Sequence, residues 1–189
     1  MEGIRIVPRI DALEIHEAGP IRHMRLVFAS GMNILTDKSG GGTGKTTILN
    51  CAAAAATEHH SSLRSQTKFI AESGANVCRF EPSGWAKAPY PPNRGDHRSG
   101  LPAGARALGS LRRALMSAPA HSLLLMDGEI LGVMDLGRLR CAIQLQAASP
   151  AQKLVVVVEP LVGYFSAFPC RLFILELRNG TARCAFAGP

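Results

Sequence analysis

One glycine-rich run holds the residues whose types and spacing are best suited to chemistry. It reads Ser39, Gly40, Gly41, Gly42, Thr43, Gly44, Lys45, Thr46 and Thr47. Glycines let successive backbone N–H groups converge on a phosphate, while a lysine followed by a threonine supplies a cation and a hydroxyl that can ligate Mg²⁺. The run therefore predicts a nucleoside triphosphate site, in which Lys45 reaches the β- and γ-phosphates and Thr46 ligates Mg²⁺.

The surrounding sequence gives this run the context of a P-loop. The pattern G-x-x-x-x-G-K-[ST] is met except at its first position, Ser39, so Gly40 or Gly41 is expected to make the tight turn instead. Residues 33–36 are predicted to form a short buried strand, and the alanine-rich segment 45–56 a helix. Strand, loop and helix in this order favour a phosphate-binding loop over a flexible glycine linker with a stray lysine.

Two later apolar runs each lead to an acid. Residues 121–127 and 153–159 are predicted to be buried strands of a parallel sheet, because such strands read as continuous aliphatic runs. Asp127 and Glu159 would then stand at the carboxyl ends of these strands. A carboxylate there is expected to hold the Mg²⁺ water shell opposite Thr46, so Asp127 is the second predicted metal ligand.

The remaining patterns complete an α/β fold. Roughly alternating segments before residue 36 predict an antiparallel lead-in, and Asn179-Gly180 predicts a terminal hairpin. The other expected elements are a hairpin over 66–80, a proline- and glycine-rich loop over 81–104, helices over 105–116 and 138–148, and a loop over 128–137. The expected fold class is a three-layer P-loop NTPase with a mixed, mainly parallel central sheet, an antiparallel β subdomain and a C-terminal hairpin.

Composition sets the broad limits. A chain of 189 residues with 47% hydrophobic and 19% charged residues is expected to form one globular domain over 1–189. The net charge of +7 is compatible with a nucleic acid, acidic lipid or acidic protein partner, and equally with a solvated basic surface. The five cysteines are dispersed without metal-ligand spacing, and no apolar run is long enough for a signal peptide or a membrane span. We therefore expect a cytoplasmic protein without membrane insertion.

Taken together, the motifs resemble the ATPase heads of the ABC and SMC superfamily. The phrase FASGMNILTD is similar to the one before the P-loop of SMC-type heads, LLLMD followed by Asp135 looks like their Walker B strand and D-loop, and RLFILELRNG looks like their closing hairpin. Where those proteins carry the signature L-S-G-G-Q-R, this chain has Leu101, Pro102, Ala103, Gly104, Ala105 and Arg106. The resemblance implies ATP held between two heads, the second presenting its signature helix in trans, and hence a homodimer or a partner ATPase head.

The chain departs from the family pattern at the groups that act on ATP. Pro102 replaces the signature serine and Ala105 the glutamine. Gly128 stands where the family has its catalytic glutamate, with Glu129 one residue later, and Glu159 stands where the switch histidine usually is. A general base must lie within hydrogen-bond reach of the attacking water, and a shift of one residue can break that reach.

The resemblance also implies a catalytic set and a compact shape. Lys45 would act on the phosphates, Glu129 would be the base and Glu159 would orient the same water, although either acid could equally be an ordinary loop acid. Gln66 is a weak match to the family's Q-loop. Segment 81–104 is too short and too rich in proline for the coiled coil of SMC proteins or the helical subdomain of transporters, so a compact head is expected.

Three functions follow as hypotheses. The leading one is an ATP-binding subunit that hydrolyses ATP with Mg²⁺ and works through nucleotide-dependent head association in a larger complex, for which DNA is a candidate partner. The second is a catalytically inactive ATP-binding module that recruits partners, favoured by the altered signature and by Gly128. The third is a small-molecule P-loop kinase, although the strands before the P-loop and the terminal hairpin are not typical of one.

Overall fold

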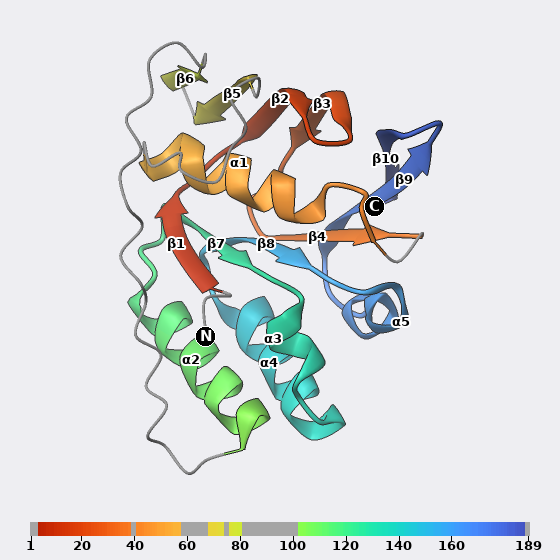
Figure 1. The fold of residues 1–189 in the computed structure, drawn as a ribbon. Helices are drawn as coiled ribbons and strands as arrows, with labels where there is room; N and C mark the ends of the chain where they lie inside the picture. Colours follow the sequence, from red (N-terminus) through yellow and green to blue (C-terminus); the bar gives the residue numbers. More distant parts are fainter. Residues whose placement is uncertain (1–3, 39–40, 58–67, 74–75, 81–101, 188–189) are drawn as a thin grey trace.

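The fold is built in three layers around a six-stranded sheet (Figure 1). One face of this sheet is covered by α1 (Lys45–Thr57) and a four-stranded sheet, and the other by α2 (Ala103–Ser117) and α4 (Leu136–Ala148). The structure is a computed structural model that describes residues 4–38, 41–57, 68–73, 76–80 and 102–187.

The six-stranded sheet has the order β1-β7-β8-β4-β9-β10. Its strands are β1 (Ile4–Pro8), β7 (Ser122–Met126), β8 (Gln152–Val156), β4 (Met32–Asp37), β9 (Cys170–Arg178) and β10 (Thr181–Ala187). The four inner strands are parallel, and the two edge strands pair antiparallel. This mixed, mainly parallel sheet confirms the predicted fold class.

Alternation along the inner strands divides the core in two. Leu35 of β4 and Val156 of β8 pack toward α1 and the four-stranded sheet, whereas Ile34 and Val155 pack toward α2 and α4. All four are nearly inaccessible to solvent, and burying each such side chain contributes about 1.5–3 kcal/mol. A sheet that is apolar on both faces explains why these strands read as continuous aliphatic runs.

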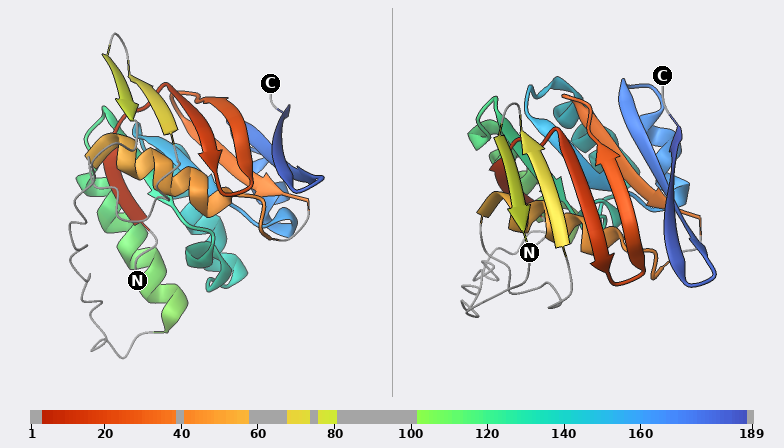
Figure 2. Two further views of the ribbon diagram at one scale, coloured as in Figure 1. Left: turned by 45° about the horizontal axis from the view of Figure 1, so that its top comes forward. Right: turned by 90° about the horizontal axis from the view of Figure 1, so that it is seen from above.

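The second sheet is antiparallel and has the order β3-β2-β5-β6. Its strands are β2 (Ala12–Ala18), β3 (Ile21–Val27), β5 (Lys68–Ser73) and β6 (Asn76–Phe80). The hairpin predicted over 66–80 is confirmed by the pairing of β5 with β6. Figure 2 shows the terminal hairpin alongside β3, where the Ala182 N–H donates to the carbonyl of Pro20 at 2.8 Å.

Short helices account for most differences from the sequence-based elements. The predicted loop over 128–137 contains α3 (Glu129–Gly132), and the predicted strand 153–159 ends at Val156, so Glu159 begins α5 (Glu159–Val162) instead. A 3₁₀ turn over Gly163–Phe165 follows. Pro160 in the first turn of α5 fits the place where a helix tolerates proline, because its missing N–H has no intrahelical partner there.

The terminal hairpin forms as predicted. β9 and β10 pair in register across Asn179 and Gly180, whose φ angles of 52° and 73° are the left-handed values that an Asn-Gly hairpin turn requires. The strand over residues 4–8 was not predicted, because only one of its five side chains is buried. Among the described helices, none is both long and apolar enough to span a membrane.

Candidate nucleotide-binding site

The predicted phosphate loop follows the carboxyl end of β4. Because β7, β8 and β4 are parallel neighbours in register, the residues that follow them emerge at one edge of the sheet. Asp127 directly follows β7, two strands from β4. At about 4.8 Å per strand, Asp127 lies about 10 Å across the sheet from the end of β4. The topology therefore places the phosphate loop and the Asp127 carboxylate at the same edge.

The described part of the loop, from Gly41 onward, has the backbone that its glycines predict. Gly42 and Gly44 have φ angles of 69° and 97°, which L side chains rarely adopt. A side chain on Gly44 would also lie 3.1 Å from Ile21, so this position needs glycine for two reasons. The Ile48 N–H then donates to the carbonyl of Gly44 at 2.9 Å and starts α1. Ser39 and Gly40 lie outside the described residues.

A buried carboxylate holds the loop in place. Asp37, the last residue of β4, is only 3% exposed and accepts a hydrogen bond from the Thr43 hydroxyl at 2.8 Å. The same oxygen forms an ion pair with the ammonium of Lys45. The P-loop lysine is thus neutralised inside its own loop, and the charge of a buried acid is compensated, as burial demands.

The sequence analysis missed Asp37, although a signal for it was present. The segment Met32–Asp37 is a buried strand that ends in an acid, the same pattern by which Asp127 was found. The P-loop pattern does not include this position, so nothing drew attention to it.

The hydroxyl and carboxylate predicted to hold Mg²⁺ have oxygen atoms available. Thr46 is exposed in the first turn of α1. Asp127 is half-buried, and its carboxylate accepts one long hydrogen bond, 3.4 Å from the Glu129 N–H. Hydroxyl and carboxylate oxygens are the donors that Mg²⁺ prefers, so the residues present fit the ion.

The predicted acids are exposed. Glu129 and Glu159 are the first residues of α3 and α5, and neither carboxylate forms a hydrogen bond or ion pair with another described residue. Gly128, between Asp127 and Glu129, packs against β8 so closely that a Cβ there would lie 2.9 Å from the carbonyl oxygen of Val156. The position that the resemblance assigns to a glutamate therefore has no room for one without a shift of the backbone.

The predicted signature segment lies at the start of α2, at the bottom of Figure 1 and away from the P-loop. Leu101 is outside the described residues, Pro102 and Ala103 are exposed, and Ala105 is half-buried. Gly104 is buried, and a Cβ there would lie 2.7 Å from the carbonyl oxygen of Val133. This glycine fixes the first turn of α2 against the segment that precedes α4.

Asp135, the predicted D-loop acid, caps α4 in this structure. Its carboxylate accepts the Arg138 N–H at 2.9 Å and also pairs with the Arg138 guanidinium. The hydrogen bond from the Arg138 backbone is the main cause that lowers the pKa of Asp135 below its usual value. An acid at a helix N-terminus is a common stabilising feature, because it satisfies an unpaired backbone N–H and complements the helix dipole. The cap accounts for Asp135 without any role in catalysis. Gln66, the weak Q-loop match, lies outside the described residues.

Comparison with known proteins identifies the fold. No family model matches the chain, and no curated protein does. Among solved structures, the SMC head in a crystal structure with the C-terminal winged-helix domain of ScpA is similar, with a TM-score of 0.58 at 10% identity over 96% of this chain and 98% of that one. The SMC head domain from Thermotoga maritima has a TM-score of 0.53 at 9% identity, over 96% of this chain and all of that one. The chain thus has the fold of SMC head domains.

Proposed function

We propose that the chain is one compact ATP-binding head, spanning residues 1–189, that hydrolyses ATP when it associates with a second head. The observation that carries the proposal is the placement of the P-loop and Asp127 at one edge of a parallel sheet, in the fold of SMC heads. Ligands of open α/β sheets bind at the carboxyl ends of the strands, which is the edge where these residues meet.

The loop's own groups define how ATP would bind. Backbone N–H groups of the loop and of the first turn of α1 would cradle the phosphates, because these amides lack intrahelical partners. Lys45 would leave Asp37 and contact the β- and γ-phosphates. Thr46 and Asp127 would hold Mg²⁺, which when bound neutralises charge on the phosphates.

The second head would supply what one chain lacks. In the proposed arrangement, the exposed start of α2, at Pro102 and Ala103, faces the γ-phosphate of the opposing head with the backbone N–H groups at the helix N-terminus. Pro102 offers neither a hydroxyl nor an N–H, so this contact is weaker than one made through a serine. Exposed Glu129 would be the general base and Glu159 would orient the water, each completed by the partner's surface.

A second candidate, an ATP-binding module without turnover, is favoured by one observation. Gly128 occupies the family's glutamate position, and its contact with Val156 excludes a larger residue. In this case ATP and Mg²⁺ would serve as structural elements, and the ATP-bound form would recruit a partner. The SMC head of known structure is bound to a domain of ScpA, and the net charge of +7 here suits an acidic protein or a nucleoprotein partner.

Measurements of ATP binding and association together test the proposal. The full chain, Lys45→Ala and Lys38→Ala are titrated with a fluorescent ATP analogue and run in analytical ultracentrifugation with and without ATP and Mg²⁺. Lys38 is a matched control, because it is an exposed lysine of the same segment that pairs with Glu176 at 2.7 Å. We expect binding and ATP-dependent association for the full chain and Lys38→Ala, and neither for Lys45→Ala.

The outcomes separate the candidates. Absence of ATP binding by the full chain overturns both the ATPase and the inactive module. Binding and association without phosphate release, alone or with a co-purified partner head, identifies the module. Transfer of phosphate to a nucleoside, with no association, identifies the kinase.

A further inference from the structure

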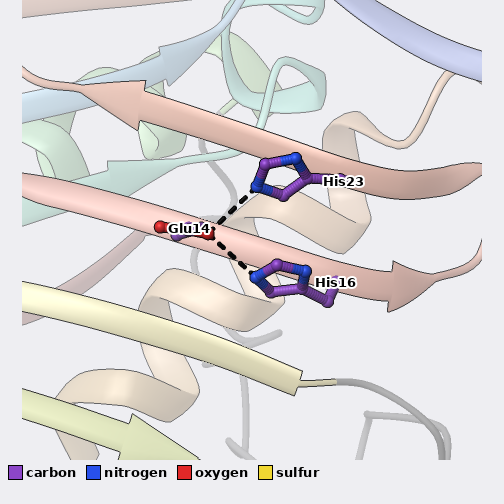
Figure 3. Close-up of side chains that lie close together, drawn as sticks. All are labelled: Glu14, His16 and His23. Carbon is purple, nitrogen blue, oxygen red and sulfur yellow. Dashed lines mark hydrogen bonds and ion pairs between the residues drawn. The ribbon is translucent and has the colours of Figure 1, made fainter.

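A cluster of metal-ligating side chains lies on the outer face of the four-stranded sheet (Figure 3). His16 of β2 and His23 of β3 are direct cross-strand partners, and Glu14 precedes His16 by two residues, on the same face. The opposite face of these strands is apolar and packs into the core through residues such as Leu13 and Ile15. The cluster is therefore held by a rigid, paired backbone instead of a loop.

The ligand atoms converge on one point. Both Nε2 atoms face the same carboxylate oxygen, Glu14 Oε1, at 2.9 Å from His16 and 3.0 Å from His23. All three ligand atoms lie within 4.8 Å of one another. Tetrahedral zinc with bonds of about 2.0–2.1 Å needs ligand atoms roughly 3.3 Å apart. The two distances to Glu14 Oε1 are already within about 0.4 Å of that spacing.

The rings of His16 and His23 lie side by side, so both could bind one metal ion. The His16 and His23 rings stack at 4.5 Å with planes 17° apart. Each imidazole has a ring nitrogen whose lone pair can bind a metal ion. With three ligand atoms from the described residues, water would complete the coordination of a bound ion.

The carboxylate of Glu14 also has a charged neighbour on the side away from the histidines. Arg25 lies 4.0 Å from Glu14 Oε2, the oxygen away from the histidines, and donates two hydrogen bonds to Glu72. Such outer-shell partners orient metal ligands in known sites.

We propose that Glu14, His16 and His23 bind a divalent transition metal of the Zn²⁺ class on the outer face of the four-stranded sheet. Two imidazoles and a carboxylate suit zinc and its neighbours in the Irving–Williams order, and disfavour Ca²⁺ and Mg²⁺, which prefer oxygen alone. The ion links β2 to β3, and it stabilises the folded sheet increasingly as the free Zn²⁺ concentration rises above the dissociation constant. This site is independent of the proposed ATP site.

Zinc titration of the full chain tests the site. Binding of Zn²⁺ is measured by competition with a chromophoric chelator in a Cys141→Ser background, because this exposed thiol is an alternative ligand. We expect one Zn²⁺ per chain and losses of at least about tenfold in affinity for His23→Ala and for Glu14→Gln, as large as or larger than the cost of losing an outer-shell partner. His121→Ala, an exposed histidine elsewhere, should bind as the parent does.

Two further readouts make the test decisive. ¹⁵N-detected imidazole spectra should show zinc at Nε2 of both rings, and zinc should raise the melting temperature of the parent but not of His23→Ala. His23 is the more exposed of the two rings, so this variant removes little packing. Equal zinc affinity in the parent and in a His16→Ala, His23→Ala double variant would overturn the proposal. Zinc binding that is present in the unaltered chain but lost in the Cys141→Ser background would overturn it as well.

Discussion

The candidate ATP site has two parts, the loop after β4 and the acids after β7 and β8. They differ in how many contacts hold their side chains in place. After β4, a buried carboxylate, a hydroxyl and a lysine contact one another, and the loop glycines have the backbone angles that the loop needs. After β7 and β8, the acids Glu129 and Glu159 are exposed, and their carboxylates form no hydrogen bond or ion pair with another described residue. The groups at the end of β4 are therefore held in place by one another, whereas no hydrogen bond or ion pair with described residues holds the acids after β7 and β8.

This difference matters because binding and turnover have different geometric demands. A phosphate bound by several backbone amides still binds when one amide is slightly misplaced. A general base, in contrast, acts only within about 3 Å of the attacking water. An exposed glutamate loses that position through side-chain motion unless a neighbour holds it. If the chain hydrolyses ATP as proposed, the partner head would be needed at the β7 and β8 ends, not at the P-loop.

Removing the proposed base should have the largest effect. Glu129→Gln is expected to lower ATP turnover by about 100-fold or more, while ATP affinity changes less than about twofold, because only the proton transfer is lost. Phosphate release and analogue binding are measured on the same preparation, beside Glu159→Gln and the exposed control Glu17→Gln. Unchanged turnover in Glu129→Gln would remove Glu129 from the mechanism.

Filling the glycine position at the acid end should cost stability. Gly128→Ala puts a methyl 2.9 Å from the Val156 carbonyl oxygen, so we expect a loss of about 1–3 kcal/mol in the free energy of unfolding. Gly132→Ala is the matched control, since nothing lies within 4 Å of its added Cβ. Urea denaturation of both variants measures the difference. Equal stability would show that the glutamate position is open after all.

Neutralising the buried acid Asp37 should raise the affinity for ATP and lower the melting temperature of the ATP-free protein. Asp37→Asn keeps a hydrogen-bond acceptor for Thr43 but frees Lys45 from its ion pair, so ATP should bind about tenfold more tightly. The melting temperature without ATP should fall for the same reason. Glu176→Gln, which frees exposed Lys38, is the control and should change neither quantity. Weaker ATP binding in Asp37→Asn would instead make Asp37 part of the binding site.

The smallest expected effect is on the pH dependence of stability, and it comes from Lys153, a buried lysine near the opposite edge of the sheet. Lys153 is 2% exposed, donates to the carbonyl of Ser149, and burial lowers its pKa from 10.5 to about 8. Above pH 8 the unfolded chain therefore binds more protons at this lysine than the folded chain does. The cost of burying the lysine falls as the pH rises, so the free energy of unfolding increases by up to about 1 kcal/mol from pH 7 to pH 9.

The thiols of buried Cys51 and half-buried Cys184 act in the opposite sense over the same pH range. Burial raises the pKa of Cys184 to about 11 and that of Cys51 to about 12, so deprotonation favours the unfolded chain as the pH approaches 9. The pH dependence of unfolding in the parent minus that in Lys153→Met isolates the lysine. A difference that does not grow from pH 7 to 9 would contradict the assignment.

Local patterns predicted the parts of the fold that depend on local forces. The P-loop backbone follows from its glycines, and the terminal hairpin from Asn179-Gly180. The strand before Asp127 follows from an aliphatic run that only a doubly covered strand can use. Each of these predictions rests on one segment and its covalent geometry.

The missed parts depend on contacts between distant segments. The ion pair from Asp37 to Lys45 forms only when the loop closes over the end of β4, and β1 is a strand because β7 offers it an edge. Gly128 looked like a lost catalytic position, but its meaning comes from the carbonyl of Val156 on another strand. Periodicity and motif spacing do not report such approaches.

The topology of the six-stranded sheet also bears on how the chain folds. The strands of the four-stranded sheet all lie before residue 81, whereas β4 joins β8 through partners such as Asn33 and Lys153, 120 positions apart. Such distant pairing raises contact order, which slows folding by the entropy of closing a long loop. On the ribosome, at about 5–20 residues per second, the apolar edges of β4 would wait several seconds for their neighbours. The P-loop strand is therefore the segment that most needs protection from aggregation during synthesis.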